Sequence, residues 1–426
     1  MSDWYESTLG QVCDAVNGLI QTGPFGSQLH QSDYTEHGVP VVMPKDIVGG
    51  RITSETVARV SVDHVERLSR HKLNSGDIIY GRRGDIGRQA LIRSDQAGWM
   101  CGTGCLRISL GESTLDPHFL HYYLSQDEVI SWITNQAVGA TMPNLNTAIL
   151  RSVPVSYPDL PVQRRIAGIL SSYDDLIENS QRRIKILEEM ARRLYREWFV
   201  HFRFPGHEGC RLVESPLGEI PEGWAICELN DFVQFKSGFA FKSGTFAADG
   251  EYRLVTIKNV QDGVFNPESD TRMSEVPANM PTYCVLNDKD ILLSLTGNVG
   301  RVCLVHDGPF LLNQRVSKLA PVEAFDWAMV YCMFRQPEMR VKLEQISNGV
   351  AQQNVSPVLA SKIDFAQPPR ELRRRFSIIA EPMGLSIVQL YTTIQNLRRT
   401  RDLLLPRLLS GQIDVDSLPE PVLSES

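Results

Sequence analysis

The feature that most constrains this chain is an internal repeat with a period of about 213 residues. The segment from Gly76 to Ile92 reappears from Lys289 to Val305, and the two copies share an Asp, both Gly of a Gly-x-x-Gly and the Arg that follows. Solenoid repeats have periods of about 20–50 residues, so a longer period indicates duplicated domains. At 426 residues the chain is also too long for one core of ordinary size.

The repeat extends to both sides of this segment. Val42 to Ile47 aligns with Val255 to Val260 at the same offset. Downstream, Gly139 to Ile169 resembles Gly349 to Ile379 at an offset of about 210, and Asn144 meets Asn354 there. Each half therefore runs in the same order: a strand-rich domain, an exit marked by proline, then a helix.

Short β-branched and apolar runs between Gly, Asn and Asp predict the strands, for example Val39 to Val42 and Asp290 to Leu293. Gly84 to Gly87 and Gly297 to Gly300 predict tight connections between two strands, where glycine supplies a positive φ. Each domain also contains one short helix, predicted at 119–124 and 327–334. Both domains are expected to be mixed α+β.

The helices that follow the two domains carry heptad seams, with apolar residues alternately four and three positions apart. At about 40 residues and about 1.5 Å per residue, such a helix is longer than the domain that precedes it. Packing of each stripe on its own domain is the ordinary alternative, but the length favours a coil in which each helix buries the other. The predicted coiled-coil interface consists of Ile166, Leu170, Tyr173, Ile177, Ile184, Leu187, Leu194, Trp198, Phe376, Met383, Ile387, Leu390, Ile394, Leu397, Leu404 and Leu408.

Three further expectations concern these helices. Pro161 falls in a first turn, where proline is tolerated, whereas Pro382 is expected to kink or interrupt the second helix. Arginine pairs and triples are expected on solvated or partner-facing helix surfaces, at 164–165, 182–183, 192–193 and 373–375.

The fold class predicted from these patterns is α+β, with two similar mixed α/β domains in tandem, joined by two long helices that form an antiparallel coiled coil. The boundaries divide the chain into a first domain, a first helix, a second domain, a second helix and an acidic tail. The corresponding ranges are 1–158, 159–204, 205–369, 370–409 and 410–426.

Charge and cysteine content limit the classes of protein. The net charge of -7 argues against a partner as acidic as nucleic acid, but the basic excess is local: positions 370–408 hold eight Lys and Arg against three Asp and Glu. The eight Cys are too few and too irregular for a disulfide framework, and structural thiols are favoured over zinc ligands for Cys101 and Cys105. No run approaches the ~18 apolar residues of a membrane span, and no signal peptide is recognised, so a soluble, cytoplasmic protein without a membrane partner is expected.

Several motifs of catalysis are missing. The sequence has no Gly-x-x-x-x-Gly-Lys-Ser/Thr phosphate loop, no Gly-x-Gly-x-x-Gly after a strand, no Gly-x-Ser-x-Gly and no His-Glu-x-x-His. It also lacks the Asn/Asp-Pro-Pro-Tyr/Phe motif of amino-methyltransferases. A catalytic role for the chain therefore has little support, and no metal site is predicted.

At several places the sequence resembles the specificity subunits of type I restriction-modification systems. The resemblance covers nearly the whole chain and rests on the order and duplication of motifs that are individually weak. These are Thr22-Gly-Pro-Phe-Gly-Ser-Gln-Leu29, the hairpin around Arg83-Gly-Asp-Ile-Gly-Arg88, Gly139-Ala-Thr-Met-Pro-Asn-Leu-Asn-Thr147, Leu160-Pro-Val-Gln-Arg-Arg-Ile-Ala167 and Leu405-Pro-Arg-Leu-Leu-Ser-Gly-Gln-Ile413.

The resemblance implies a non-catalytic, DNA-reading subunit with two target recognition domains separated by helical spacers. It implies assembly on double-stranded DNA with two adenine methyltransferase subunits and with ATP-dependent restriction subunits. This chain would bind no cofactor, and S-adenosylmethionine, ATP and Mg would be held by the partners. The second half departs from the pattern at Lys236 to Gly244, which suggests two different half-sites.

Candidate DNA contacts are basic and amide side chains predicted on loops, where Arg pairs bidentately with guanine or binds phosphate. A solvated surface charge or a residue that stabilises a turn is the alternative for each. The candidates are Lys45, Arg82, Arg83, Arg88, Lys236, Lys242, Lys258, Asn298, Arg301, Gln314 and Arg315.

Two other functions remain open on the sequence. A coiled-coil scaffold whose duplicated domains hold proteins would show no salt-dependent affinity for DNA. A stand-alone DNA-modifying enzyme with a divergent active site would act as an isolated chain, and the missing motifs make it the weakest of the three.

Overall fold

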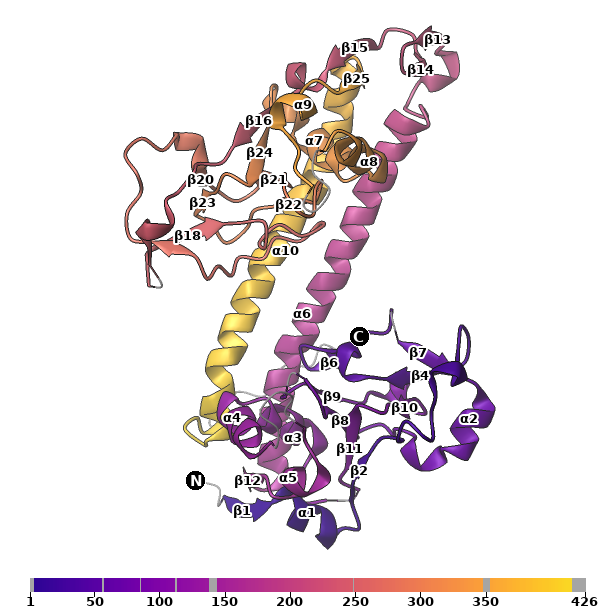
Figure 1. Ribbon diagram of the computed structural model, residues 1–426, viewed down its shortest axis with the longest axis vertical. Coiled ribbons are helices and arrows are strands. Elements are labelled where there is room, and N and C mark those ends of the chain that lie inside the picture. The colour runs from indigo at the N-terminus through magenta and orange to yellow at the C-terminus, as the bar shows by residue number, and fades with distance from the viewer. Residues whose placement is uncertain are drawn as a thin grey trace. The chain divides into compact units, whose positions relative to one another are not determined.

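The computed structural model describes residues 4–55, 57–84, 86–111, 113–137, 144–247, 249–347 and 353–415 (Figure 1). Internal contacts divide the chain into two compact units. Unit 1 is Met1–Asp175 with Arg398–Ser426, and unit 2 is Leu176–Leu397. The division falls inside both long helices, so each unit contains part of each helix.

Unit 1 has two four-stranded sheets. The first has the order β2-β11-β8-β9 and is antiparallel throughout, whereas the second has the order β10-β4-β7-β3 and pairs β10 with β4 in parallel. Their strands are β2 (Leu19–Thr22), β11 (Cys105–Ser109), β8 (Ile78–Gly81), β9 (Gln89–Leu91), β10 (Met100–Cys101), β4 (Val39–Val42), β7 (Ala58–Val60) and β3 (Tyr34–Thr35).

The described part of unit 1 also contains two small strand pairs and five short α-helices. Helix α3 begins where Asp116 caps it, with Oδ1 accepting from the backbone N–H of His118 at 2.9 Å and of Phe119 at 3.2 Å. These elements are β1 (Tyr5–Thr8) with β12 (Pro154–Tyr157), β5 (Ile47–Val48) with β6 (Arg51–Ile52), and α1 (Leu9–Ala15), α2 (Val62–Arg67), α3 (Pro117–Leu124), α4 (Asp127–Gln136) and α5 (Thr147–Arg151).

Unit 2 repeats this arrangement. Its antiparallel sheet has the order β16-β24-β21-β22, and its mixed sheet has the order β17-β19-β18-β23-β20, with β18 parallel to β23 as β4 is to β10. The strands are β16 (Val233–Ser237), β24 (Val316–Pro321), β21 (Ile291–Ser294), β22 (Val302–Leu304), β17 (Phe246–Ala247), β19 (Arg272–Met273), β18 (Tyr252–Val255), β23 (Phe310–Leu312) and β20 (Val285–Leu286). The duplication seen in the sequence is therefore a duplication of the fold.

The remaining elements of unit 2 also have counterparts in unit 1. The pair β15 with β25 matches β1 with β12, and the three short helices match α3, α4 and α5. The hairpin of β13 with β14 has no counterpart among the described elements of unit 1. Their bounds are β15 (Ala225–Glu228), β25 (Asp364–Gln367), β13 (Leu212–Ser215), β14 (Gly218–Pro221), α7 (Trp327–Phe334), α8 (Pro337–Gln345) and α9 (Pro357–Ala360).

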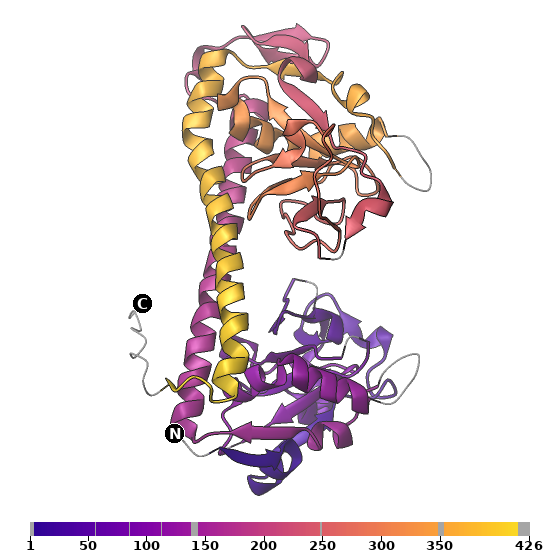
Figure 2. The same cartoon turned by 90° about the vertical axis from the view of Figure 1, so that its left-hand side faces the viewer.

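The two long helices are α6 (Leu160–Tyr195), which continues into a π-helical turn at Arg196–Val200, and α10 (Arg370–Leu409). Within each unit they lie side by side and run in opposite directions (Figures 1 and 2). In unit 2 the end of α6 meets the start of α10, because the Phe376 ring lies 5.8 Å from Trp198 and 5.0 Å from Phe199. In unit 1 the start of α6 meets the end of α10, where Ile166 and Leu408 share one apolar core.

The predicted seam residues are buried or half-buried in both units. Those of unit 1, except Tyr173, lie in the core that α6 and α10 share with the first domain, and those of unit 2 lie in the core that they share with the second domain. Tyr173 is half-buried and belongs to neither core. The seams therefore pack against each other and against the domains at the same time.

The expected interruption at Pro382 is wrong, because α10 is continuous from Arg370 to Leu409. Pro382 is exposed, and the carbonyl that loses its N–H partner belongs to Ile378, which is 74% exposed and can be hydrated. Burial of the seam on the opposite side outweighs one lost hydrogen bond. Gly384 also has a role in this stretch, since a Cβ there would lie 2.6 Å from the Trp327 ring.

The expectation of a solvated surface also fails for Arg373. This side chain is buried, its guanidinium pairs with Asp326, and its Nε donates to the Pro368 carbonyl at 3.2 Å. Gln163 occupies the equivalent place in unit 1 and bonds the Pro158 carbonyl at 2.7 Å and the Asp116 N–H at 2.7 Å. The same buried position between the long helix and the domain is thus occupied by an amide in unit 1 and by an ion pair in unit 2.

Phe376→Ala tests the packing of α6 against α10. Phe376 is fully buried among aromatic rings, so its truncation is expected to lower the free energy of unfolding by about 3–5 kcal/mol. Ile378→Ala, on the exposed face of the same helix, is the matched control and is expected to stay within about 0.5 kcal/mol of the wild type. Denaturant unfolding measures both, and equal losses would show that this face of α10 is not held by the α6 seam.

Candidate nucleic-acid interface

In unit 1, three chain segments meet at one edge of the β2-β11-β8-β9 sheet. The loop after β2 begins at Gly23, whose N–H donates to the Cys105 carbonyl at 2.9 Å, and the hairpin after β8 begins at Arg82, whose N–H donates to the Gly104 carbonyl at 2.8 Å. The turn that follows β4 also reaches this edge, because Pro44 lies directly against Gly81 and Gly104. These loops bring four of the candidate cations to one edge.

The four candidates of unit 1 differ in how they are held. Lys45, Arg83 and Arg88 are exposed. Arg82 is half-buried, and its Nε donates to Asn144 Oδ1 and to the Leu145 carbonyl, both at 3.1 Å. Arg82 therefore fixes the base of the hairpin, while the three exposed cations remain directed to the surface.

Glycine shapes this hairpin, as the sequence predicts. Gly84 and Gly87 have φ values of 81° and 110°, in the region that glycine alone adopts readily, and Gly297 and Gly300 repeat this in unit 2 at 77° and 79°. Asp85, in the same motif, lies outside the described residues, as do positions 139–143 of the Gly139–Thr147 motif.

Unit 2 forms the equivalent edge. Gln314 N–H donates to the Phe239 carbonyl at 3.1 Å, Leu295 N–H donates to the Arg315 carbonyl at 3.2 Å, and Asn313 N–H donates to the Val255 carbonyl at 3.3 Å. The turn at 313–315 therefore joins the loops that follow β16, β18 and β21. Exposed candidates on these loops are Lys242, Lys258, Asn298, Gln314 and Arg315.

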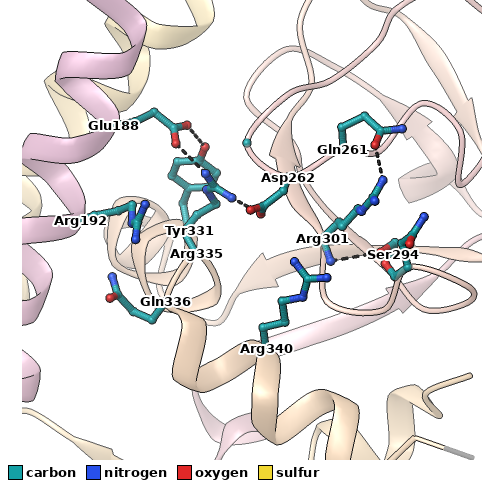
Figure 3. Close-up of polar contacts among 12 residues, drawn as sticks. Glu188, Arg192, Gln261, Asp262, Ser294, Arg301, Tyr331, Arg335, Gln336 and Arg340 are labelled. Atoms are coloured by element: carbon teal, nitrogen blue, oxygen red, sulfur yellow. Dashed lines mark hydrogen bonds and ion pairs between the residues drawn. The ribbon is translucent and has the colours of Figure 1, made fainter. Parts of the chain in front are cut away.

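Two candidates of unit 2 are engaged with the protein itself. Lys236 is half-buried, with its ammonium 5.7 Å from the centre of the Tyr283 ring. Arg301 is half-buried and donates through Nη1 to Gln261 Oε1, while its backbone N–H donates to Ser294 Oγ at 3.1 Å (Figure 3). Arg301 thus supports its hairpin, much as Arg82 does in unit 1.

The residues that support the hairpins were not singled out as site residues on the sequence. Asn144 pairs with Arg83 in an isolated bridge, and Asn354 pairs with Thr296 in the same way, with Thr296 Oγ1 2.8 Å from Asn354 Oδ1. The alignment of the two Asn in the repeat is the signal that could have identified them. Gln261 gives no comparable signal.

Two buried thiols, Cys101 and Cys105, lie next to the edge of unit 1. Burial raises the pKa of the Cys101 thiol to about 12 and that of the Cys105 thiol well above its ordinary value, so both stay protonated near neutral pH. Among the residues that the structure describes, no three His, Cys, Asp or Glu side chains are placed to hold a metal ion. Within the same described ranges, no helix is long and apolar enough to cross a membrane.

The two units thus carry equivalent edges of exposed cations and amides. The family described as "Type I restriction modification DNA specificity domain" matches residues 1–189 and 221–367. The chain belongs to this family. The resemblance seen in the motifs is therefore confirmed, and the chain is a specificity subunit, which confers DNA sequence specificity and is not itself the catalyst.

Relatives match along almost the entire chain. The MjaIX specificity subunit of Methanocaldococcus jannaschii is 24% identical over 91% of this chain and 89% of its own length. The HindI specificity subunit of Haemophilus influenzae is 23% identical over 97% of this chain and 100% of its own. The crystal structure of the type I S subunit from M. genitalium has the same fold, with a TM-score of 0.59 at 18% identity and 96% coverage of both chains.

Arg82 and Arg83 give a paired test of the two kinds of arginine. Arg82→Ala removes two hydrogen bonds from a half-buried guanidinium and is expected to lower the free energy of unfolding by about 1–3 kcal/mol. Arg83→Ala is expected to leave stability unchanged, to weaken DNA binding, and to reduce the slope of log affinity against log salt by about one unit. Thermal unfolding and a salt titration of binding separate the two, and an unchanged salt slope for Arg83→Ala would remove it from the interface.

Proposed function

We propose that this specificity subunit reads a bipartite, asymmetric DNA target, with one half-site for each recognition domain, and directs partner adenine methyltransferase and restriction subunits to it. The observation that carries the proposal is the duplicated edge, built on the same strands in both units but furnished with different side chains. Two similar readers that present different groups select two different half-sites.

The difference between the edges is visible at equivalent hairpin positions. Arg82 of unit 1 corresponds to Leu295 of unit 2, and Arg83 corresponds to Thr296. Outside the hairpins, Lys45 and its counterpart Lys258 are exposed in both units, and unit 2 also presents Gln314 and Arg315. Amides favour adenine and guanidinium groups favour guanine, so such edges support different base preferences.

The acidic net charge is consistent with this division of labour. Counterion release from phosphates supplies most non-specific affinity for DNA, and a chain of net charge -7 gains little of it. Partners that grip the backbone would supply that affinity, while this chain supplies discrimination between sequences.

Apolar side chains exposed on the long helices support docking of the methyltransferase subunits there. A helix whose seam is already buried has no internal use for further large apolar residues, and such residues favour a partner surface. On α6 they are Leu176, Ile186 and Met190, and on α10 they are Ile378, Ile379, Leu385 and Leu403. In this assembly S-adenosylmethionine, ATP and Mg would belong to the partner subunits, not to this chain.

The proposal is tested by sequencing the methylome of a host that carries this chain and its methyltransferase partner. A methylated motif of two unlike half-sites with a fixed gap is expected, and it should vanish when this chain is deleted. A protein scaffold would give no such motif and no salt-dependent DNA affinity, and methyl transfer by the isolated chain would indicate an enzyme instead.

Removing one heptad from α6, residues 177–183, tests whether the helices set the gap between half-sites. Seven residues shorten a helix by about 10.5 Å, which corresponds to about three base pairs of the duplex. With a matching deletion in the facing part of α10, the gap is expected to shorten while the bases of each half-site stay the same. The methylated motif of the variant measures this, and altered half-sites with an unchanged gap would contradict it.

A further inference from the structure

In unit 1 a carboxylate of α6 joins the first domain to both long helices. Asp174 accepts a hydrogen bond from Tyr122 Oη on α3 at 2.7 Å through one oxygen, and from Arg401 Nη1 on α10 at 2.5 Å through the other. Tyr122 is buried, and Asp174 and Arg401 are half-buried. The three groups form one clamp, which we call the unit 1 clamp.

The unit 1 clamp is connected to the hairpin that carries Arg88. His121, next to Tyr122, is joined twice to Gln89: Nδ1 lies 2.9 Å from Gln89 Oε1, and Gln89 Nε2 donates to the His121 carbonyl at 2.9 Å. Burial lowers the pKa of His121 to about 4, so its ring is neutral and Nδ1 can donate to the amide oxygen. Gln89 is the first residue after Arg88, and it is itself buried.

Unit 2 has a second clamp, formed by other residues (Figure 3). Glu188 of α6 accepts from the hydroxyl of Tyr331 on α7 and from Arg335 Nη2 at 2.9 Å, and Arg335 Nη1 also pairs with Asp262. The side chains of Arg335 and Glu188 are only 9% and 13% exposed. This set is the unit 2 clamp.

The unit 2 clamp also ends at its hairpin. Gln261 directly precedes Asp262 in the chain and accepts a hydrogen bond from Arg301 Nη1 (Figure 3). Arg301 is the counterpart of Arg88 in the internal repeat. In each unit, therefore, polar contacts and directly adjacent residues connect a carboxylate of α6 to the hairpin. The path ends at Gln89, next to Arg88, in unit 1 and at Arg301 in unit 2.

The chemistry of the clamps favours a positional role. A buried ion pair adds little to stability compared with well-packed apolar groups, but its directional bonds specify one arrangement of the parts that it joins. An apolar face can slide, whereas a carboxylate with a tyrosine on one oxygen and an arginine on the other has one well-satisfied position. Both carboxylates lie on α6, and their positions, 174 and 188, are two heptads apart.

We propose that Asp174 and Glu188 are positioning residues for DNA recognition, each holding one recognition domain and its hairpin at a fixed place on α6. The inference rests on the proposed bipartite function and deepens it. Loss of a clamp loosens the attachment of one recognition domain to α6 without changing the side chains that this domain presents to DNA. It therefore relaxes the required gap between half-sites and leaves the bases of each half-site as they were.

The experiment compares Asp174→Asn and Glu188→Gln with the wild type, each as the full chain in complex with its methyltransferase partner. Affinity is measured for duplexes that carry the methylome-defined half-sites with the native gap and with one base pair added or removed. One base pair moves a half-site by ~3.4 Å and rotates it by ~35°. The wild type is expected to prefer the native gap about tenfold or more, and each variant is expected to reduce this preference to about threefold or less.

The adjacent acids supply matched controls. Asp175→Asn and Glu189→Gln remove the same charge from the same helix, but these side chains are 76% and 47% exposed. Their ion pairs, Asp175 with Arg51 at 3.8 Å and Glu189 with Arg193 at 2.6 Å, lie at the surface and are expected to contribute little. Asp175→Asn and Glu189→Gln are expected to retain the wild-type preference for the gap. Equal behaviour of a clamp variant and its neighbouring control would overturn the proposal, as would a change in the preferred bases.

Tyr122→Phe and Tyr331→Phe keep the test decisive if a carboxylate variant fails to fold. Each removes one hydroxyl from a clamp and is expected to relax the gap in the same direction, by a smaller factor. A folded Tyr→Phe pair with unaltered gap preference would refute the proposal. Failure of the wild type itself to select one gap would refute the bipartite function instead, so the two failures are distinguishable.

Discussion

The burial of the apolar seams of α6 and α10 is the constraint on which both units depend. In unit 2 the core contains Ile184 from the helix that precedes the domain and Phe376 from the helix that follows it. In unit 1 the core contains Ile166 near the start of α6 and Leu408 near the end of the chain, and Gly411 beyond it lies against Trp4. The core of each domain includes residues from both long helices, and in unit 1 the α10 segment comes from the far end of the sequence. The helices are therefore structural parts of the domains and not linkers between them.

The duplication preserves the positions of contacts more strictly than the residue types that form them. Asp77 pairs with Arg107 at 2.7 Å in one unit, and Asp290 pairs with Lys318 at 2.7 Å in the other. The sheet requires a cation opposite that aspartate, and either basic residue satisfies it. A fold that needs only a residue of the right chemical type at such positions can diverge widely in sequence, in keeping with relatives that share about a quarter of their residues.

The sequence predicts the fold well because its two main signals are periodic. The repeat defines the two domains, and the heptads define two long helices whose seam residues are found buried. The interruption expected at Pro382 is wrong because the identity of one residue does not show whether the carbonyl that loses its hydrogen bond faces solvent. That outcome depends on which side of α10 packs against α6.

The candidate interface is predictable only in part. The turns that carry Arg83 and Arg88 follow from their glycines, but the engagement of Arg82 by Asn144 depends on a contact across 62 positions, and that of Arg301 by Gln261 on one across 40. The clamps are harder still. Asp174 and Asp175 are neighbours of the same chemistry, and so are Glu188 and Glu189, yet only the first of each pair is enclosed. Local pattern cannot separate them, since the tyrosine and arginine partners are brought in by the tertiary fold.

Arg88 and Arg301 show how two readers can differ without any change at the aligned position. At equivalent positions of the two hairpins, Arg88 is exposed in unit 1, whereas Arg301 is bonded to Gln261 in unit 2. A guanidinium at the surface is more accessible to a base or phosphate than one that is half-buried against an amide of a supporting loop. Binding preference at such a position is set by what surrounds the arginine, so substitutions in the supporting loop can alter a half-site while the strands and the hairpin stay the same.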